Sequence, residues 1–201
     1  MEGDYVYYKV YSLIDKKSIS DLKKLKNTIC TIQVDDLGTS KIIGEIENTM
    51  GLIIRITSEN SDYIVKNTPE LKDDGEESPS IVVTQSNVQD INKNIWIKLL
   101  ENKTLESLSI VTDCLIWNND KNTWELKIDV GIKMVFKGGL SILIMAKNSS
   151  VGLFEIWTSQ KQDEVDKTII SISNEKIVEF WGFEPRLDSF KKIKRFKTTI
   201  F

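Results

Sequence analysis

The sequence predicts a mainly β protein, of the α+β type with few short helices, whose antiparallel strands form a meander or sandwich-like sheets. Apolar side chains occupy every second position from Trp124 to Phe136, a period of two that is typical of a strand with one buried and one wet face. Ala146 is the only alanine, so the strongest helix former is almost absent. Isoleucine and other β-branched residues supply much of the apolar material, which favours strands.

The first 68 residues contain one candidate helix and several candidate strands. Ser18, as an N-cap with Asp21 three residues later, predicts a short helix that Asn27 ends. The expected strands are Tyr5–Ile14, Ile29–Val34, Lys41–Ile46, Leu52–Ile56 and Tyr63–Val65.

The second half predicts a run of antiparallel strands joined by turns. We expect a bend near Gly131, because residues 124–136 exceed the usual strand length of about five or six residues. Gly138 and Gly139 predict a tight hairpin turn. Residues 174–181 fit either a short helix or a strand. The other expected strands are Ile95–Leu100, Leu108–Trp117, Leu140–Met145, Leu153–Trp157 and Ile169–Ile172.

An acidic segment with two prolines, residues 69–80, separates the two halves. We expect an exposed loop or linker there, between a β-rich part with one helix (residues 1–68) and a β meander with a basic tail (residues 81–201). A single domain with a long surface loop is an equal alternative. The pattern G-L-x-I-x-I-x-x-x-N-S begins at Gly51 and again at Gly139. It indicates a duplicated β unit, and chance similarity between isoleucine-rich strands is the alternative.

The chemistry available to this chain is restricted. It has no histidine, which removes the usual general base and every histidine-dependent triad. It also lacks the glycine-rich phosphate loops and the GxSxG turn of hydrolases. Cys30 and Cys114 show no zinc-ligand spacing, and we expect both to be buried, reduced thiols. We therefore expect no enzyme activity, no metal and no cofactor; carboxylate chemistry, lysine chemistry and Mg²⁺ sites with oxygen ligands are the catalytic alternatives.

Charge and hydropathy indicate a compartment and a class of partner. The first residues lack a basic signal-peptide region, and no stretch reaches the ~20 apolar residues of a membrane span, so we expect a cytoplasmic protein without membrane contact. The chain carries −3 and residues 189–201 carry +5, which leaves −8 on residues 1–188. The tail's lysines and aromatic rings suit nucleic acid, but an acidic body repels phosphate, and only three arginines are present. We therefore favour a protein partner, and take the tail as a terminal strand or helix packed on the body.

The candidate contact residues are carboxylates. Asp35 and Asp36 lie at a predicted strand end, where Mg²⁺ binding and ordinary turn chemistry are the alternatives to partner binding. An acidic surface would attract a basic partner and speed its capture. The alternative is that these carboxylates only keep the protein soluble. The acidic segment contributes the remaining candidates: Glu70, Asp73, Asp74, Glu76 and Glu77.

The five tryptophans are expected mainly in the core. Trp117 and Trp124 flank one predicted hairpin and are expected to pair across it. A surface tryptophan used as a binding anchor is the alternative, because protein interfaces are enriched in this residue.

The chain resembles, in size, acidic body, lack of a signal peptide and the meander WELKIDVGIKMVFKGGLSILI (residues 124–144), the small immunity proteins that bacteria make against their own contact-delivered toxins. The resemblance implies a non-catalytic inhibitor that binds a toxin domain, expected to be basic, and blocks its active site. The family has no shared motif, so no functional residue can be carried over. Two other classes stay open: a histidine-free carboxylate or Mg²⁺-dependent enzyme, and a structural or accessory β protein.

Overall fold

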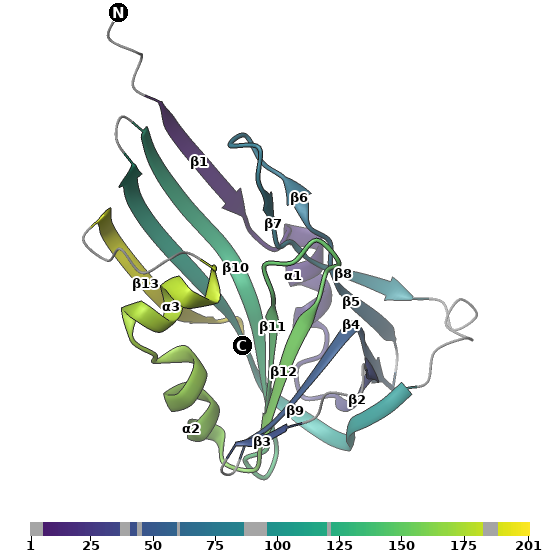
Figure 1. Ribbon diagram of the computed structural model, residues 1–201. Coiled ribbons are helices and arrows are strands. Elements are labelled where there is room, and N and C mark those ends of the chain that lie inside the picture. Colours follow the sequence, from purple (N-terminus) through teal and green to yellow (C-terminus); the bar gives the residue numbers. More distant parts are fainter. Residues whose placement is uncertain are drawn as a thin grey trace, which may run out of the picture.

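The computed structural model describes residues 6–36, 41–43, 46–59, 61–86, 96–119, 122–182 and 189–201. These residues form a mainly β structure, as the sequence predicts, with few short helices (Figure 1). No helix in the described part of the chain is long and apolar enough to span a membrane. The helical segments are α1 (Lys16–Lys23), α2 (Gln162–Val165), the π-helical turn η2 (Asp166–Ile170) and α3 (Asn174–Phe180).

Most of the strands belong to one large sheet, and β6 and β7 form a small one. The strands of the first half are β1 (Tyr7–Ser12), β2 (Ile29–Asp36), β3 (Lys41–Ile43), β4 (Ile46–Ser58), β5 (Asp62–Asn67), β6 (Glu70–Leu71), β7 (Glu77–Ser78) and β8 (Ile81–Ser86). Those of the second half are β9 (Trp96–Asn119), β10 (Asn122–Phe136), β11 (Ser141–Ala146), β12 (Phe154–Ser159) and β13 (Phe190–Thr199).

Six strands of the large sheet close into a ring. The antiparallel pairings run from β10 through β11, β12, β4, β2 and β9 and return to β10. Strands from both sides of residues 69–80 therefore share one sheet. Buried side chains from all six ring strands, from β5 and β8 and from α1 form the larger of two cores, which we call the ring core.

The far halves of β9 and β10 extend beyond the ring and form a four-stranded part of the sheet with β1 and β13 (Figure 1). We call this part, in the order β1–β10–β9–β13, the outer sheet. β1 pairs with β10 in parallel, and β13 pairs with β9 in antiparallel orientation, so the basic tail is a strand. Side chains from α2, η2 and α3 cover one face of the outer sheet and form the second core.

A β-bulge divides β10 between the two cores. Asp129 pairs with Thr112 and Gly131 pairs with Val111, which leaves Val130 as an extra residue. The bend predicted near Gly131 is therefore confirmed. An extra residue reverses the side to which the following side chains point, because the strand repeat is two residues.

The prediction of one buried face along Trp124–Phe136 is wrong for this reason. Ile128 belongs to the second core, whereas Ile132 belongs to the ring core. Two charged residues predicted on the wet face are buried instead: Lys133 is 1% exposed and Asp129 is 9% exposed. Each side of the strand faces a core along part of its length.

The strand β9 corrects another expectation. Residues 95–100 and 108–117 are predicted as two strands with a turn between them, but Trp96–Asn119 is one strand of 24 residues. The expected turn stays extended because β2 pairs with it, Cys30 with Lys103 and Ile29 with Thr104. Only Asn102, with a φ of 52°, retains a turn-like backbone.

The helix α1 forms where it is predicted, but its cap differs. The carboxylate of Asp15 is the N-cap and accepts hydrogen bonds from the backbone N–H groups of Lys17 and Ser18. Ser18 is buried instead, where its hydroxyl bonds with both the carbonyl and the N–H of Val83 in β8. The helix ends at Lys23 with Lys24 as its C-cap, earlier than predicted, and Asn27, with a φ of 59°, lies in the turn that follows.

The segment after β12 is helical. Residues 169–172 are predicted as a strand, but Ile169 and Ile170 are the last two residues of η2. Ile170 packs into the second core. Residues 174–181, which fit two alternatives in the sequence, form α3 and its C-cap Trp181. Gly182 follows with a φ of 73°, as a helix end favours.

The two repeated segments form β4 and β11. Gly51 lies inside β4, opposite Asp36, whereas Gly139 lies in the turn before β11. Gly138 and Gly139 have φ angles of 96° and 88°, so the predicted tight turn is confirmed. Each segment therefore contains a strand, but the glycine lies within the strand in the first segment and in the turn before it in the second. Duplication stays a hypothesis.

Candidate functional site

Four aromatic rings cross the outer sheet, one from each strand. Tyr8 pairs in register with Trp124, Trp124 with Trp117, and Trp117 with Phe190. The ring centroids of these successive pairs are 5.2, 5.7 and 5.7 Å apart. We call the four rings the aromatic ladder. The predicted pairing of Trp117 with Trp124 is confirmed, and all four rings are partly exposed.

A buried ion pair lies on the same face of the outer sheet as the ladder. Arg195 of β13 donates from Nε and Nη2 to the two carboxylate oxygens of Asp113 in β9, at 2.7 Å each. Trp181 donates from Nε1 to the same carboxylate at 2.9 Å, and Arg195 also donates to the carbonyl of Ile169 at 3.2 Å. The pair therefore ties two strands to η2 and to the end of α3.

The charged residue Asp113 lies within β9 and on the face of the outer sheet that carries the second core. Its side chain is fully buried, because the helical segments cover that face of the outer sheet. The bidentate geometry suits a desolvated pair, since each carboxylate oxygen receives a charged donor.

The acidic segment forms a hairpin whose backbone is fixed. Glu70 pairs with Ser78 across the β6–β7 sheet, and Gly75 forms the turn with a φ of 82°. The N–H of Thr68 donates to the carbonyl of Ser80 at 2.8 Å and closes the base of the hairpin. The carboxylates of this segment are therefore held on a defined scaffold.

The hairpin and the ladder border a cleft of about 510 Å³. Its volume lies in the range of small-ligand sites, about 300–1,000 Å³. Carboxylates of the hairpin form one wall: Asp74, Glu76 and Glu77. The apolar floor consists of Val10, Trp117, Trp124, Leu126 and Trp181. An apolar floor beside carboxylates suits a lysine or arginine side chain, whose aliphatic stem packs on rings while its charged end meets the acids.

The hairpin's other acids do not line this cleft. Glu70 accepts hydrogen bonds from Lys72 Nζ at 2.6 Å and from Ser80 Oγ at 3.0 Å. The bond from Lys72 is the main cause that holds the pKa of Glu70 below its ordinary value; burial opposes this effect, and the bond from Ser80 adds to it. Asp73 is exposed near the hairpin turn.

Asp35 has a different setting. It lies in β2 and does not line the cleft, and its carboxylate accepts hydrogen bonds from the N–H groups of Leu52 and Ile53 at 2.9 and 2.6 Å. It therefore satisfies backbone donors of β4 at the bulge beside Gly51. Asp36 ends the same strand, and its side chain lies outside the described residues.

The acidic residues and cysteines of the described part of the chain bear on metal binding and thiol chemistry. There, no group of three or more histidine, cysteine, aspartate or glutamate residues could hold a metal ion. Cys30 and Cys114 are both free thiols, Cys30 buried and Cys114 half-buried. Burial raises the pKa of both thiols, so both stay protonated at neutral pH.

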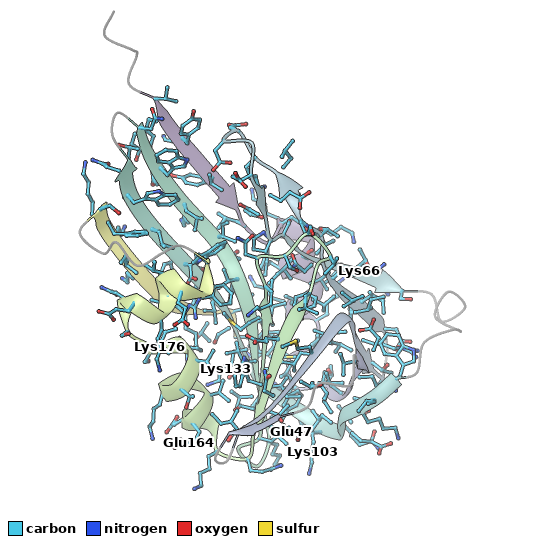
Figure 2. All side chains as sticks on the ribbon, viewed as in Figure 1. Glu47, Lys66, Lys103, Lys133, Glu164 and Lys176 are labelled. Atoms are coloured by element: carbon cyan, nitrogen blue, oxygen red, sulfur yellow. The ribbon has the colours of Figure 1, made fainter. Side chains whose placement is uncertain are left out.

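A second polar cluster lies between the outer sheet and η2, where Figure 2 labels Lys133. Asp166 accepts from Lys133 Nζ and from Lys197 Nζ, at 2.6 Å each. Burial lowers the pKa of Lys133, and Asp166 partly offsets this effect. The two lysines hold the pKa of Asp166 below its ordinary value, although burial acts in the opposite direction. With Lys133 only 1% exposed, the cluster fastens η2 to β10 and β13.

The sequence identifies the cleft's acids better than its floor. Trp181 and Val10 come from elements whose pairing or packing is not visible in the local pattern. The basic composition of the tail likewise gives no sign that the side chain of Arg195 is buried while the neighbouring lysines are exposed. Comparisons with protein-family models, curated proteins and solved structures find no match to this chain.

Proposed function

We propose that this chain is a cytoplasmic, non-catalytic binding protein that captures a basic protein partner in the cleft between the acidic hairpin and the aromatic ladder. The observation that carries the proposal is the joining of three carboxylates and an aromatic floor in one cleft of about 510 Å³. Acids alone would only attract a cation, whereas the floor also buries the apolar stem of a lysine or arginine.

Neighbouring groups hold the aromatic side chains of the floor. Ladder rings are paired in register, and Trp181 is hydrogen-bonded to the buried Asp113. A pre-formed surface loses little conformational entropy when a partner binds, which favours affinity. Tryptophan in such a setting is typical of interface anchors.

The partner that we propose is a toxin domain, which this protein would neutralise as an immunity protein. A toxin that handles nucleic acid needs a basic surface to hold phosphate, and a basic surface fits the acidic wall of the cleft. The resemblance to immunity proteins and the acidic balance of residues 1–188 point in the same direction.

The test is co-expression with the product of the neighbouring gene, followed by purification and kinetic measurement. We expect a stable complex whose association rate falls by at least tenfold between low and high salt, because long-range attraction is screened. We also expect the protein to restore growth of cells that express the partner.

Matched variants locate the surface. Glu76→Gln with Glu77→Gln removes two charges from the cleft, and Glu70→Gln with Asp73→Asn removes two from the same hairpin outside it. The first pair should slow association several-fold and weaken protection, and the second should do so much less. Equal effects of the two pairs, or a complex indifferent to salt, would reject the cleft as the docking surface.

A further inference from the structure

The face of the outer sheet opposite the helices is basic and aromatic. Its side chains alternate along each strand with residues of the second core, so they point the other way. One row in register across the four strands is Tyr11, Lys127, Cys114 and Lys194. A second row is Lys9, Glu125, Ile116 and Lys192. Together with Phe196, two residues beyond Lys194, these side chains form what we call the basic face.

The basic face is accessible and carries a positive charge. Lys9, Lys192 and Lys194 are exposed, and Tyr11 is 43% exposed. Four lysines against one carboxylate give the described side chains of this face a net charge of +3. Every member except Lys9 lines a hollow of about 340 Å³.

Glu125 is the one acid on the face, and neighbouring tyrosines hold it. Tyr7 donates its hydroxyl to Glu125 at 2.8 Å. Hydrogen bonds from Tyr11 and Tyr7 lower the pKa of Glu125, and the bond with Glu125 raises the pKa of Tyr11 to about 12. Tyr11 is therefore neutral at physiological pH, and it lies opposite Lys127 in the register of β1 and β10.

We propose that the basic face binds single-stranded nucleic acid. Proteins that hold single strands combine a positively charged surface, which follows the phosphates, with aromatic rings on which bases stack. Here the lysines lie on both sides of the hollow, on β10 and on β13, and rings border it from β1 and from β13. A hollow of about 340 Å³ is of the size that accepts a small planar group such as a base.

The acidic balance of the rest of the chain does not prevent this contact. At physiological ionic strength the Debye length is about 8 Å, so distant carboxylates are largely screened while lysines in contact with phosphate are not. Arg195 is buried, so lysines supply the positive charge of this face. Lysine binds phosphate as a point charge without reading bases, which predicts weak sequence preference.

A single strand fits the face better than the two obvious alternatives. Bases in a duplex are already stacked and leave the rings without a partner. An acidic polypeptide would use the lysines but would leave the aromatic hollow unfilled. This proposal concerns the face opposite the cleft and does not depend on the partner proposed for that cleft.

The experiment is fluorescence anisotropy of the full chain with a labelled twelve-nucleotide oligothymidylate. We expect binding that weakens with salt, with log K falling by about 0.7 per lysine–phosphate contact as log[salt] rises by one. The triple variant Lys127→Gln/Lys192→Gln/Lys194→Gln should lose at least tenfold in affinity and most of the salt dependence.

A matched control removes three exposed lysines elsewhere. Lys16→Gln/Lys23→Gln/Lys66→Gln lowers the net charge equally, and Figure 2 labels Lys66 on the side of the molecule away from β1 and β13. This control should stay within about threefold of the parent, because screening limits the effect of charges that do not touch phosphate. Tyr11→Ser should lose roughly tenfold while keeping the salt dependence, because a ring contacts a base and not a phosphate.

The outcomes are distinct. No binding of the oligothymidylate, equal loss in the control, or equal binding of a duplex of the same length would overturn the proposal. Tighter binding of polyglutamate than of oligothymidylate would also overturn it and would assign the face to an acidic protein. Circular dichroism of each variant establishes that the sheet is intact before binding is compared.

Discussion

Arg195 and Asp113 form a bidentate ion pair in which the two side chains are only 1% and 0% exposed. The pair joins β13 to β9 on the face of the outer sheet that carries the aromatic ladder, and Trp181 shares the carboxylate. Removal of one partner of such a desolvated pair is strongly destabilising, because the remaining charge stays buried without its counter-ion.

The first prediction concerns this pair. Arg195→Met should lower the free energy of unfolding by about 3–5 kcal/mol, because it leaves the Asp113 carboxylate without its cation. Urea unfolding followed by tryptophan fluorescence measures the change. Lys194→Met, at an exposed neighbouring position of β13, should change stability by about 0.5 kcal/mol or less. Similar losses in both variants would contradict a specific role for the pair.

The second prediction concerns Asp166. Asp166→Asn should lower stability by about 2 kcal/mol near neutral pH, because the buried ammonium group of Lys133 then loses its ion pair with Asp166. Burial already places the pKa of Lys133 below 10.5, and removal of Asp166 should lower that pKa further. The folded variant then binds fewer protons than the unfolded chain over a wider pH range, so its stability rises with pH.

The difference between parent and Asp166→Asn should therefore narrow from about pH 7 to about pH 10. Urea unfolding at three pH values across this range measures it. A difference that stays constant, or that widens, would mean that Lys133 remains charged in the folded variant.

The third prediction concerns the N-cap of α1. The Ser18 hydroxyl, followed by backbone N–H groups, holds the pKa of Asp15 below 3.8, so its contribution to stability is complete above that value and is lost as the pH falls through the folded pKa. Asp15→Ala should lower stability by about 1 kcal/mol at neutral pH. The difference from the parent should shrink below pH 3.8. Asp73→Ala, at an exposed hairpin position, serves as the control and should show little change at any pH.

The fourth prediction separates two glycines with positive φ. An alanine Cβ at Gly152 would clash with the carbonyl oxygen of Asn67, whereas one at Gly75 would meet open space. Gly75→Ala should lower the melting temperature by about 2–4 °C, the result of roughly 1 kcal/mol of left-handed backbone strain. Gly152→Ala should lower it at least twice as much, and differential scanning calorimetry measures both. Equal shifts would show that Asn67 moves aside freely.

The fold class is predictable because the signals that decide it are local. The alternation from Trp124 to Phe136 and the lack of alanine both favour strands without reference to the rest of the chain. Closure of the ring is not predictable in this way. It requires β2 and β4 to pair with β9 and β12, which lie far away in the sequence.

The bulge at Val130 shows how a correct local pattern can give a wrong face. Apolar residues continue at even positions on both sides of the bulge, because both cores need them. The sequence marks Gly131 as a bend but contains no sign that the facing reverses there. Lys133 consequently falls on a predicted wet face and is buried in the structure.

The acids of the hairpin are equally visible in the sequence, but only some of them line the cleft. Asp74 and Glu77 lie against the floor, whereas Asp35 is used to bind the backbone of β4. Composition identifies such residues as a class. Their separate roles depend on contacts between segments that are distant in the sequence, such as the pairing of β1 with β10 that brings Val10 to the cleft and the pairing of β2 with β4 that brings Asp35 to the backbone.

The strands β9 and β10 run through the outer sheet and the ring, so one pair of strands carries both candidate binding surfaces and both cores. Neither core can melt while the other keeps its strands, and the described molecule should therefore unfold in one cooperative transition. A ligand on either surface would then raise the melting temperature of the entire molecule, the ring included.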